Sequence, residues 1–83
     1  METWMKELLE NIEKNVGKEK ISHYQTVILP QILMDFNKQL ENADKDRLIS
    51  EEYRMEDGSL TIRLSGMKDS RGKCLVKESK VLR

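Results

Sequence analysis

The residues of this chain best suited to chemistry are one cysteine and one histidine. Cys74 and His23 are the only residues of their types, so together they form the only available thiol–imidazole nucleophile pair. No residues near Cys74 indicate an oxyanion hole, and a lone cysteine in a small domain usually behaves as a buried apolar residue. We therefore expect Cys74 to pack as a structural residue and His23 to be a packed or half-exposed helix residue.

The acidic residues show no spacing that is typical of a catalytic or metal site. Glu52 and Glu56 share one face of a strand-like segment with Arg54, which predicts a solvated face with internal ion pairing. The segment 44–46 resembles a calcium loop only in charge, because the glycine and the distal glutamate of such a loop are missing. The sequence has no phosphate-binding, dinucleotide-binding or hydrolase motif. We expect no enzymatic activity, no metal and no cofactor.

The charges divide the chain into two opposite parts. Residues 1–61 contain eight Lys/Arg and thirteen Asp/Glu, whereas residues 62–83 contain seven Lys/Arg and two Asp/Glu. The net charge of zero is thus the sum of −5 and +5. A chain with this division attracts its own copies, an acidic protein or a phosphate backbone.

The basic part contains the candidate partner-binding residues Lys68, Arg71, Lys73 and Lys77. They fall in or beside a glycine-flanked loop, 66–72, and in the segment that follows it, a placement that suits phosphate contact. No aromatic residue is interleaved with them for base stacking. The preferred partner is therefore a protein, with an acidic surface as its expected chemistry, and nucleic acid is the alternative.

Two helices are predicted to precede this basic part. Apolar residues at helical spacing predict a first helix from Thr3 to Val16, with Thr3 as a candidate N-cap and Gly17 directly after its end. A second helix is expected to begin at Ser22, where Ser22 and Gln25 have the spacing of a capping box, and to end near Asn42. Pro30 lies inside it and predicts a kink, because proline lacks the N–H that a regular helix needs.

The second helix has an additional apolar seam opposite its main apolar stripe. His23, Val27, Pro30 and Met34 follow one another at intervals of four, three and four residues, so they project in similar directions. Two explanations remain open: the seam contacts a second copy of the chain through His23, Val27 and Met34, or the kink merges both stripes into one core.

The pattern changes to a period of two after residue 50, which predicts strands. Asp57-Gly58 stands between two alternating runs and predicts a β-hairpin with a type I′ turn, in which Tyr53 faces Ile62 and Glu52 faces Arg63. A third strand is expected over about 73–82, with lysines that protect a sheet edge from aggregation.

These patterns predict a single domain over residues 1–83, with an α+β fold that runs from an N-terminal helix through a kinked second helix to a three-stranded antiparallel β-meander. The thin core of so short a chain favours a homo-oligomer. The single cysteine and the charged N-terminus favour a cytoplasmic location, and no apolar run is long enough for a membrane. The function we expect is that of a small non-enzymatic, protein-binding regulator or adaptor that acts as a homodimer; the alternative is a nucleic-acid-binding regulator.

Overall fold

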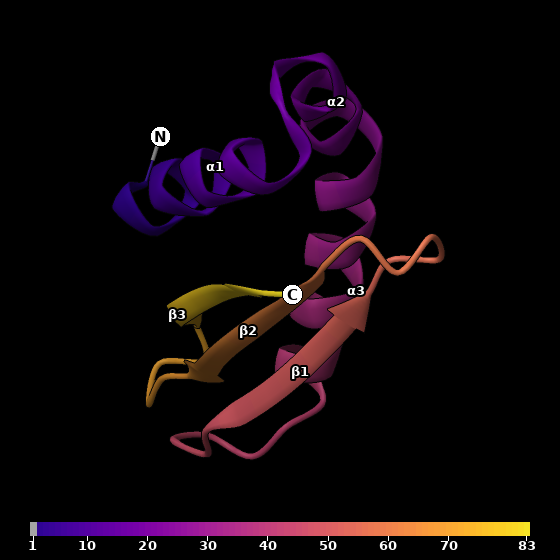
Figure 1. Ribbon diagram of the computed structural model, residues 1–83. Helices are drawn as coiled ribbons and strands as arrows, with labels where there is room; N and C mark the ends of the chain where they lie inside the picture. Colours follow the sequence, from indigo (N-terminus) through magenta and orange to yellow (C-terminus); the bar gives the residue numbers. More distant parts are fainter. Residues whose placement is uncertain (1) are drawn as a thin grey trace.

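The computed structural model describes residues 2–83 and confirms the predicted order of elements (Figure 1). The helix α1 (Thr3–Val16) is followed by a long bent helix, and then by the antiparallel strands β1 (Ile49–Arg54), β2 (Thr61–Lys68) and β3 (Cys74–Leu82). The strand order in the sheet is β1-β2-β3, so β2 is central and the other two strands form the edges. Both helices cover the same face of the sheet: α1 lies against β3, and the second helix crosses all three strands.

Helix α1 has the predicted bounds, although its start differs in detail. Leu8 and Ile12, one turn apart, are its buried residues. Glu2 occupies the N-cap position and Thr3 is the first helical residue, so the predicted Thr3 cap does not form. Gly17 ends the helix with a φ of 87°, a backbone conformation that glycine adopts without steric cost, and its N–H donates to the Glu13 carbonyl at 2.8 Å.

The second helix begins earlier than predicted and contains a π-helical turn. It consists of α2 (Lys18–His23), η1 (Tyr24–Ile28) and α3 (Leu29–Glu41), joined without a break. The predicted capping box at Ser22 is wrong, because Ser22 lies within α2 and its carbonyl accepts a hydrogen bond from the Thr26 hydroxyl at 2.8 Å. Gly17 directly precedes Lys18 and already separates the two helices, so no side-chain cap is formed at this start.

The π-helical turn gives the predicted bend a specific place. The Leu29 N–H donates to the Tyr24 carbonyl five residues back, instead of four. Pro30 follows immediately, as the second residue of α3, and it has no N–H to donate to the preceding turn, so the regular ladder of helix hydrogen bonds is interrupted there. The helix therefore bends just before Pro30, in agreement with the predicted kink.

The hairpin register is confirmed and the turn type is not. Glu52 lies opposite Arg63 and Tyr53 opposite Ile62, as the alternation of apolar residues predicts. A type I′ turn requires a positive φ at both central residues, but only Gly58 has one, at 72°. The Gly58 N–H donates to the Met55 carbonyl at 3.0 Å and the Met55 N–H donates to Leu60 at 3.0 Å, so four residues, 56–59, form the connection.

Strand β2 continues through the segment predicted as a loop. Gly66, Met67 and Lys68 belong to β2 and pair with β3, and the register shifts between Ser65 and Gly66. Gly66 is buried, and a Cβ at this position would collide with the Leu75 carbonyl and lie 3.2 Å from the Phe36 ring. The glycine is therefore needed for close packing of a strand, whereas the sequence pattern indicated a turn.

The core lies between the helices and the inner face of the sheet. Its buried side chains come from all layers: Leu8, Ile12, Tyr24, Leu29, Ile32, Phe36, Leu40, Leu60, Ile62 and Leu64. Phe36 of α3 is the largest of those that are fully buried. No polar or charged residue among those described is buried, which means that the interior depends on shape and apolar contact alone.

We expect Gly66→Ala to destabilise the fold more than an ordinary glycine substitution in a strand. The added methyl group must push β3 away from β2 or displace Phe36, an overpacking effect that costs about 1–3 kcal/mol. The free energy of unfolding from urea titration is the measurement. Thr61→Ala, at the start of β2 and on its opposite face, is the control. A Gly66→Ala variant as stable as this control would show that the contact is not tight.

Candidate interaction surfaces

One of the four predicted basic partner-binding residues has a structural role. Lys68, the last residue of β2, donates from its Nζ to the Glu41 carbonyl at 2.7 Å. Glu41 is the last residue of α3, so the ammonium group satisfies a free carbonyl at the negative end of the helix. The structure therefore uses Lys68 to join the end of α3 to the sheet, and its charge is partly engaged inside the molecule.

The other three basic side chains are exposed. Arg71 and Lys73 lie in the loop between β2 and β3, where their backbone N–H groups donate to one carboxylate oxygen of Asp69 at 2.9 and 2.8 Å. This loop is thus held by Asp69, while the two basic side chains are exposed and form no ion pair with another described residue. Lys77 is exposed on β3, beside the register shift. Arg71, Lys73 and Lys77 form what we name the basic edge.

The predicted self-association seam is divided between two sides of the second helix. His23 and Val27 line a hollow between this helix and β1. Pro30 lines a groove on the other side, between α3 and α1, and Met34 lies one turn beyond it. The π-helical turn accounts for the division: it adds a residue to one turn, so side chains after Ile28 are rotated relative to those before Tyr24. The role of His23, Val27 and Met34 in self-association stays a prediction.

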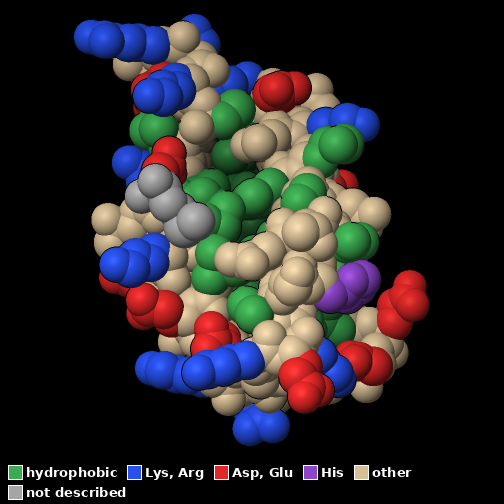
Figure 2. Space-filling view, turned by 90° about the horizontal axis from the view of Figure 1, so that it is seen from above, with side chains coloured by type: hydrophobic (Ala, Val, Ile, Leu, Met, Phe, Trp, Pro, Cys, Tyr) green, Lys and Arg blue, Asp and Glu red, His purple; other side chains and the backbone are tan. Residues whose placement is uncertain are grey.

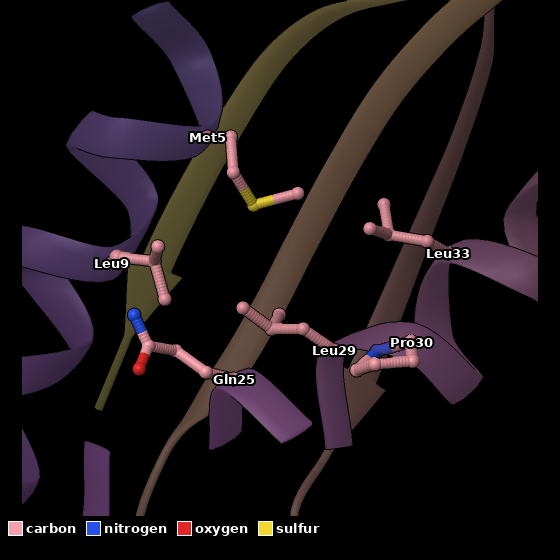
Figure 3. Close-up of a pocket in the computed structure, with 6 residues that line it drawn as sticks. All are labelled: Met5, Leu9, Gln25, Leu29, Pro30 and Leu33. Carbon is pink, nitrogen blue, oxygen red and sulfur yellow. The ribbon is translucent and has the colours of Figure 1, made fainter. Parts of the chain in front are cut away.

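The groove between α1 and α3 is almost entirely apolar. Met5 and Leu9 point into it from α1, and Leu29 and Leu33 point into it from α3, with the strands beneath (Figure 3). Its volume is about 290 Å³. Hydrophobic side chains gather in a hollow of this helical face, and charged side chains lie mainly around it (Figure 2). We name this surface the helical groove.

The hollow on the β1 side is larger and of mixed chemistry. Its volume is about 560 Å³, and the five consecutive residues 52–56 form one wall. The helix supplies the opposite wall, with His23, Val27, Ile28, Gln31 and Ile32. We name it the β1 hollow. Sequence reasoning missed it, because a hollow between a helix and a strand depends on their relative position in space.

A tyrosine and an aspartate join the helix to β1 at this hollow. The Tyr53 hydroxyl donates to Asp35 Oδ2 at 2.7 Å, and the Gln39 amide donates to the same oxygen at 2.9 Å. The hydrogen bond from Tyr53 is the main reason that the pKa of Asp35 lies below its usual value. Burial, followed by this bond and the charges of Asp35 and Glu51, raises the pKa of Tyr53. The pair therefore favours an ionised Asp35 and a neutral Tyr53.

The two residues of the formal nucleophile pair lie at different edges of the sheet. His23 is exposed beside β1, whereas Cys74 is half-buried in β3. Over residues 2–83, no three His, Cys, Asp or Glu side chains are grouped so that they could hold a metal ion. Within the same range, no helix has both the length and the apolar character needed to cross a membrane.

Comparison with known proteins assigns no relative to this arrangement. Neither the known family models, nor the curated proteins, nor the solved structures contain a match to this chain.

We expect the contribution of the Tyr53–Asp35 hydrogen bond to depend on pH at both extremes. The pKa of Asp35 is lower in the folded than in the unfolded protein. The stability that its carboxylate contributes is therefore fully present above the unfolded pKa of 3.8 and is lost as the pH falls. The pKa of Tyr53 is higher in the folded than in the unfolded protein. The stability that its neutral hydroxyl contributes is therefore fully present below the unfolded pKa of 10.0 and is lost at higher pH. The difference in melting temperature between the parent and Tyr53→Phe should therefore be largest between these values.

Thermal melts from pH 2.5 to 10.5 measure this difference. Asp35→Asn, which keeps an oxygen acceptor for the Tyr53 hydroxyl, should lose the dependence at acid pH. A difference that stays constant down to pH 2.5 would mean that the ionised carboxylate does not contribute.

Proposed function

We propose that the protein is a small non-enzymatic, protein-binding regulator or adaptor that acts as a homodimer through its helical face. The observation that supports this proposal is the helical groove together with Met34, whose side chain is 63% exposed. Met34 lies one helical turn after Pro30, which lines the groove, so a protruding apolar side chain stands next to an apolar recess.

This combination suits a second copy of the chain. A two-fold contact uses the same patch on both subunits, so the patch must contain both the protruding group and the recess that receives it. The helical face meets this condition with Met34 and the groove formed by Met5, Leu9, Leu29 and Leu33. Methionine is flexible and polarisable, and it fills irregular apolar recesses well.

The size of the molecule also favours association. Its accessible surface is 5814 Å², and a standard interface of about 800 Å² per partner would take about one-seventh of it. Among residues 2–83, ten hydrophobic residues are buried in the core and few of them are aromatic, so the burial of more apolar area would add stability that a small domain lacks.

The basic edge is proposed to contact an acidic protein partner. Arg71, Lys73 and Lys77 are exposed, and Asp69 holds the loop that presents the first two. Residues 69–83 contain no aromatic side chain, so a base-stacking platform of the kind used for single-stranded nucleic acid is missing from this surface. Nucleic acid therefore remains the alternative ligand of the basic edge.

The dimer is tested with Met34→Glu. We expect the parent to sediment as a dimer at tens of micromolar and the variant to shift towards monomer, because a buried carboxylate in the groove would be desolvated without a partner. Leu48→Glu is the matched control. Leu48 is an apolar residue exposed to a similar extent as Met34, at 59%, but it lies in the connection before β1 and not at the helical groove. A parent protein that remains monomeric at every concentration would refute the homodimer.

The ligand of the basic edge is tested by charge reversal. We expect the parent to bind random-sequence duplex DNA more weakly than micromolar at about 150 mM salt, because few phosphates are neutralised. The triple variant Arg71→Glu, Lys73→Glu and Lys77→Glu is compared with reversal of three exposed lysines elsewhere, Lys18, Lys20 and Lys38. Submicromolar DNA binding that only the first variant abolishes would support the nucleic-acid alternative and oppose the proposed acidic protein.

A further inference from the structure

Strand β1 is an edge strand with unused backbone groups. The Met55 N–H donates to the Leu60 carbonyl, which makes Met55 and Leu60 a hydrogen-bonded pair. Because such pairs alternate along an antiparallel ladder, Tyr53 and Glu51 also bond towards β2. The N–H and C=O groups of the intervening residues, Ser50, Glu52 and Arg54, consequently point away from the sheet. They form a row of donors and acceptors that an additional strand can use.

The two edges of the sheet differ in how they are protected. Strand β3 carries Lys77 and Lys80 and is interrupted by the register shift opposite Ser65 and Gly66, and both features hinder the addition of a strand. Strand β1 contains no lysine and no proline, and its pairing with β2 is regular from Ile49 to Arg54. Of the two edges, β1 is the one that can accept another strand.

The β1 hollow lies beside this free edge and provides room for side chains. Side chains of a strand added to β1 would alternate between the outer face and the helical face of the sheet. Those on the helical face would enter the hollow, where Val27, Ile28 and Met55 offer apolar contact. Val27 is 41% exposed there, so apolar surface is available that the chain does not itself cover.

The charge around the hollow selects the chemistry of the occupant. Segment 49–58 contains four carboxylates and one arginine, a net charge of −3. Glu52 and Glu56 border the hollow, with Glu52 on the exposed outer face of β1 where Arg54 also lies, and Asp35 and Glu51 act on Tyr53 in its wall. Only Glu52 is engaged in an ion pair among the described residues, with Arg63 at 2.9 Å. A segment with basic residues is therefore electrostatically complementary to this edge.

We propose that an extended segment of a partner protein, with apolar residues at alternate positions and basic residues between them, binds as a fourth strand at the free edge of β1. Its backbone would bond to Ser50, Glu52 and Arg54, its apolar side chains would fill the β1 hollow, and its basic side chains would face the carboxylates. This is strand addition, in which backbone hydrogen bonds give affinity and side-chain pockets give specificity.

A second copy of the chain suits this edge less well. Pairing of β1 with β1 of another molecule would place acidic segments against each other, which is unfavourable. Pairing of β1 with the basic β3 of another molecule is head-to-tail and would continue into a ring or an open filament, and the lysines and register shift of β3 hinder it. The site does not depend on the proposed dimer, because the helical groove and the β1 hollow have no lining residue in common.

The test uses a fluorescein-labelled seven-residue peptide of alternating valine and lysine. We expect it to bind at least about tenfold more tightly than the same peptide with glutamate in place of lysine, and N-methylation of alternate backbone amides should weaken it by at least about tenfold. Anisotropy titrations give the affinities. Amide chemical shifts should move along Ser50–Arg54 and along His23–Gln31, and not along β3. Equal binding of the lysine and glutamate peptides, or shifts confined to another surface, would overturn the proposal.

Two substitutions of Arg54 distinguish the contribution of its backbone N–H to peptide binding from that of its side chain. Arg54→Pro removes an outward N–H that β2 does not use, so an edge strand should tolerate it and lose peptide binding. Arg54→Ala keeps the N–H and should retain binding. A folded Arg54→Pro variant that binds like Arg54→Ala would refute strand addition. If Arg54→Pro does not fold, the N-methylated peptide decides the question on the parent protein.

A second copy of the chain at this edge is tested by looking for filaments of the parent protein at increasing concentration. Filaments that the lysine peptide does not dissolve would show that β3 of a second copy occupies the edge, and they would refute the proposal.

Discussion

The arrangement of the layers depends on the close approach of α3 to the backbone of β2 and β3 at Gly66. Phe36 is fully buried there, and no side chain larger than hydrogen fits between its ring and the Leu75 carbonyl. This contact sets how near the second helix lies to the sheet and where it crosses the strands. The two recesses follow from it: with α3 fixed over the sheet, a groove remains towards α1 and a hollow remains towards β1.

The elements that sequence patterns predicted correctly are those specified by local periodicity. The bounds of α1 and the register of Tyr53 opposite Ile62 follow from spacings of three to four and of two residues. The errors have physical causes. The pattern around Gly66 predicts a loop, because the contact that requires a glycine there, the ring of Phe36, lies 30 positions away in the sequence. The S-x-x-Q spacing at Ser22 predicts a cap, but the same spacing also occurs inside helices, and Ser22 lies within α2.

The candidate sites were predictable only in part for the same reason. The exposure of Arg71, Lys73 and Lys77 agrees with their pattern in a polar, glycine-containing segment. The role of Lys68 at the end of α3 required knowledge of where two distant segments meet. The predicted seam through His23, Val27 and Met34 requires a regular helix of 3.6 residues per turn. The π-helical turn changes the direction in which residues after it project relative to those before it, and Pro30 is the only sign of this turn in the sequence.

The π-helical turn has a consequence for how this chain tolerates change in length. A π-helical turn holds one more residue than an α-helical turn, so it is equivalent to a single-residue insertion that the helix has absorbed without breaking. Deleting one residue from 24–28 would therefore restore regular winding and leave Phe36 in its place over Gly66, whereas deleting one residue between Leu29 and Phe36 would turn Phe36 about the helix axis by about 100°. The second helix thus tolerates a change of length at this one turn, while the rest of α3 does not, because Phe36 must stay over Gly66.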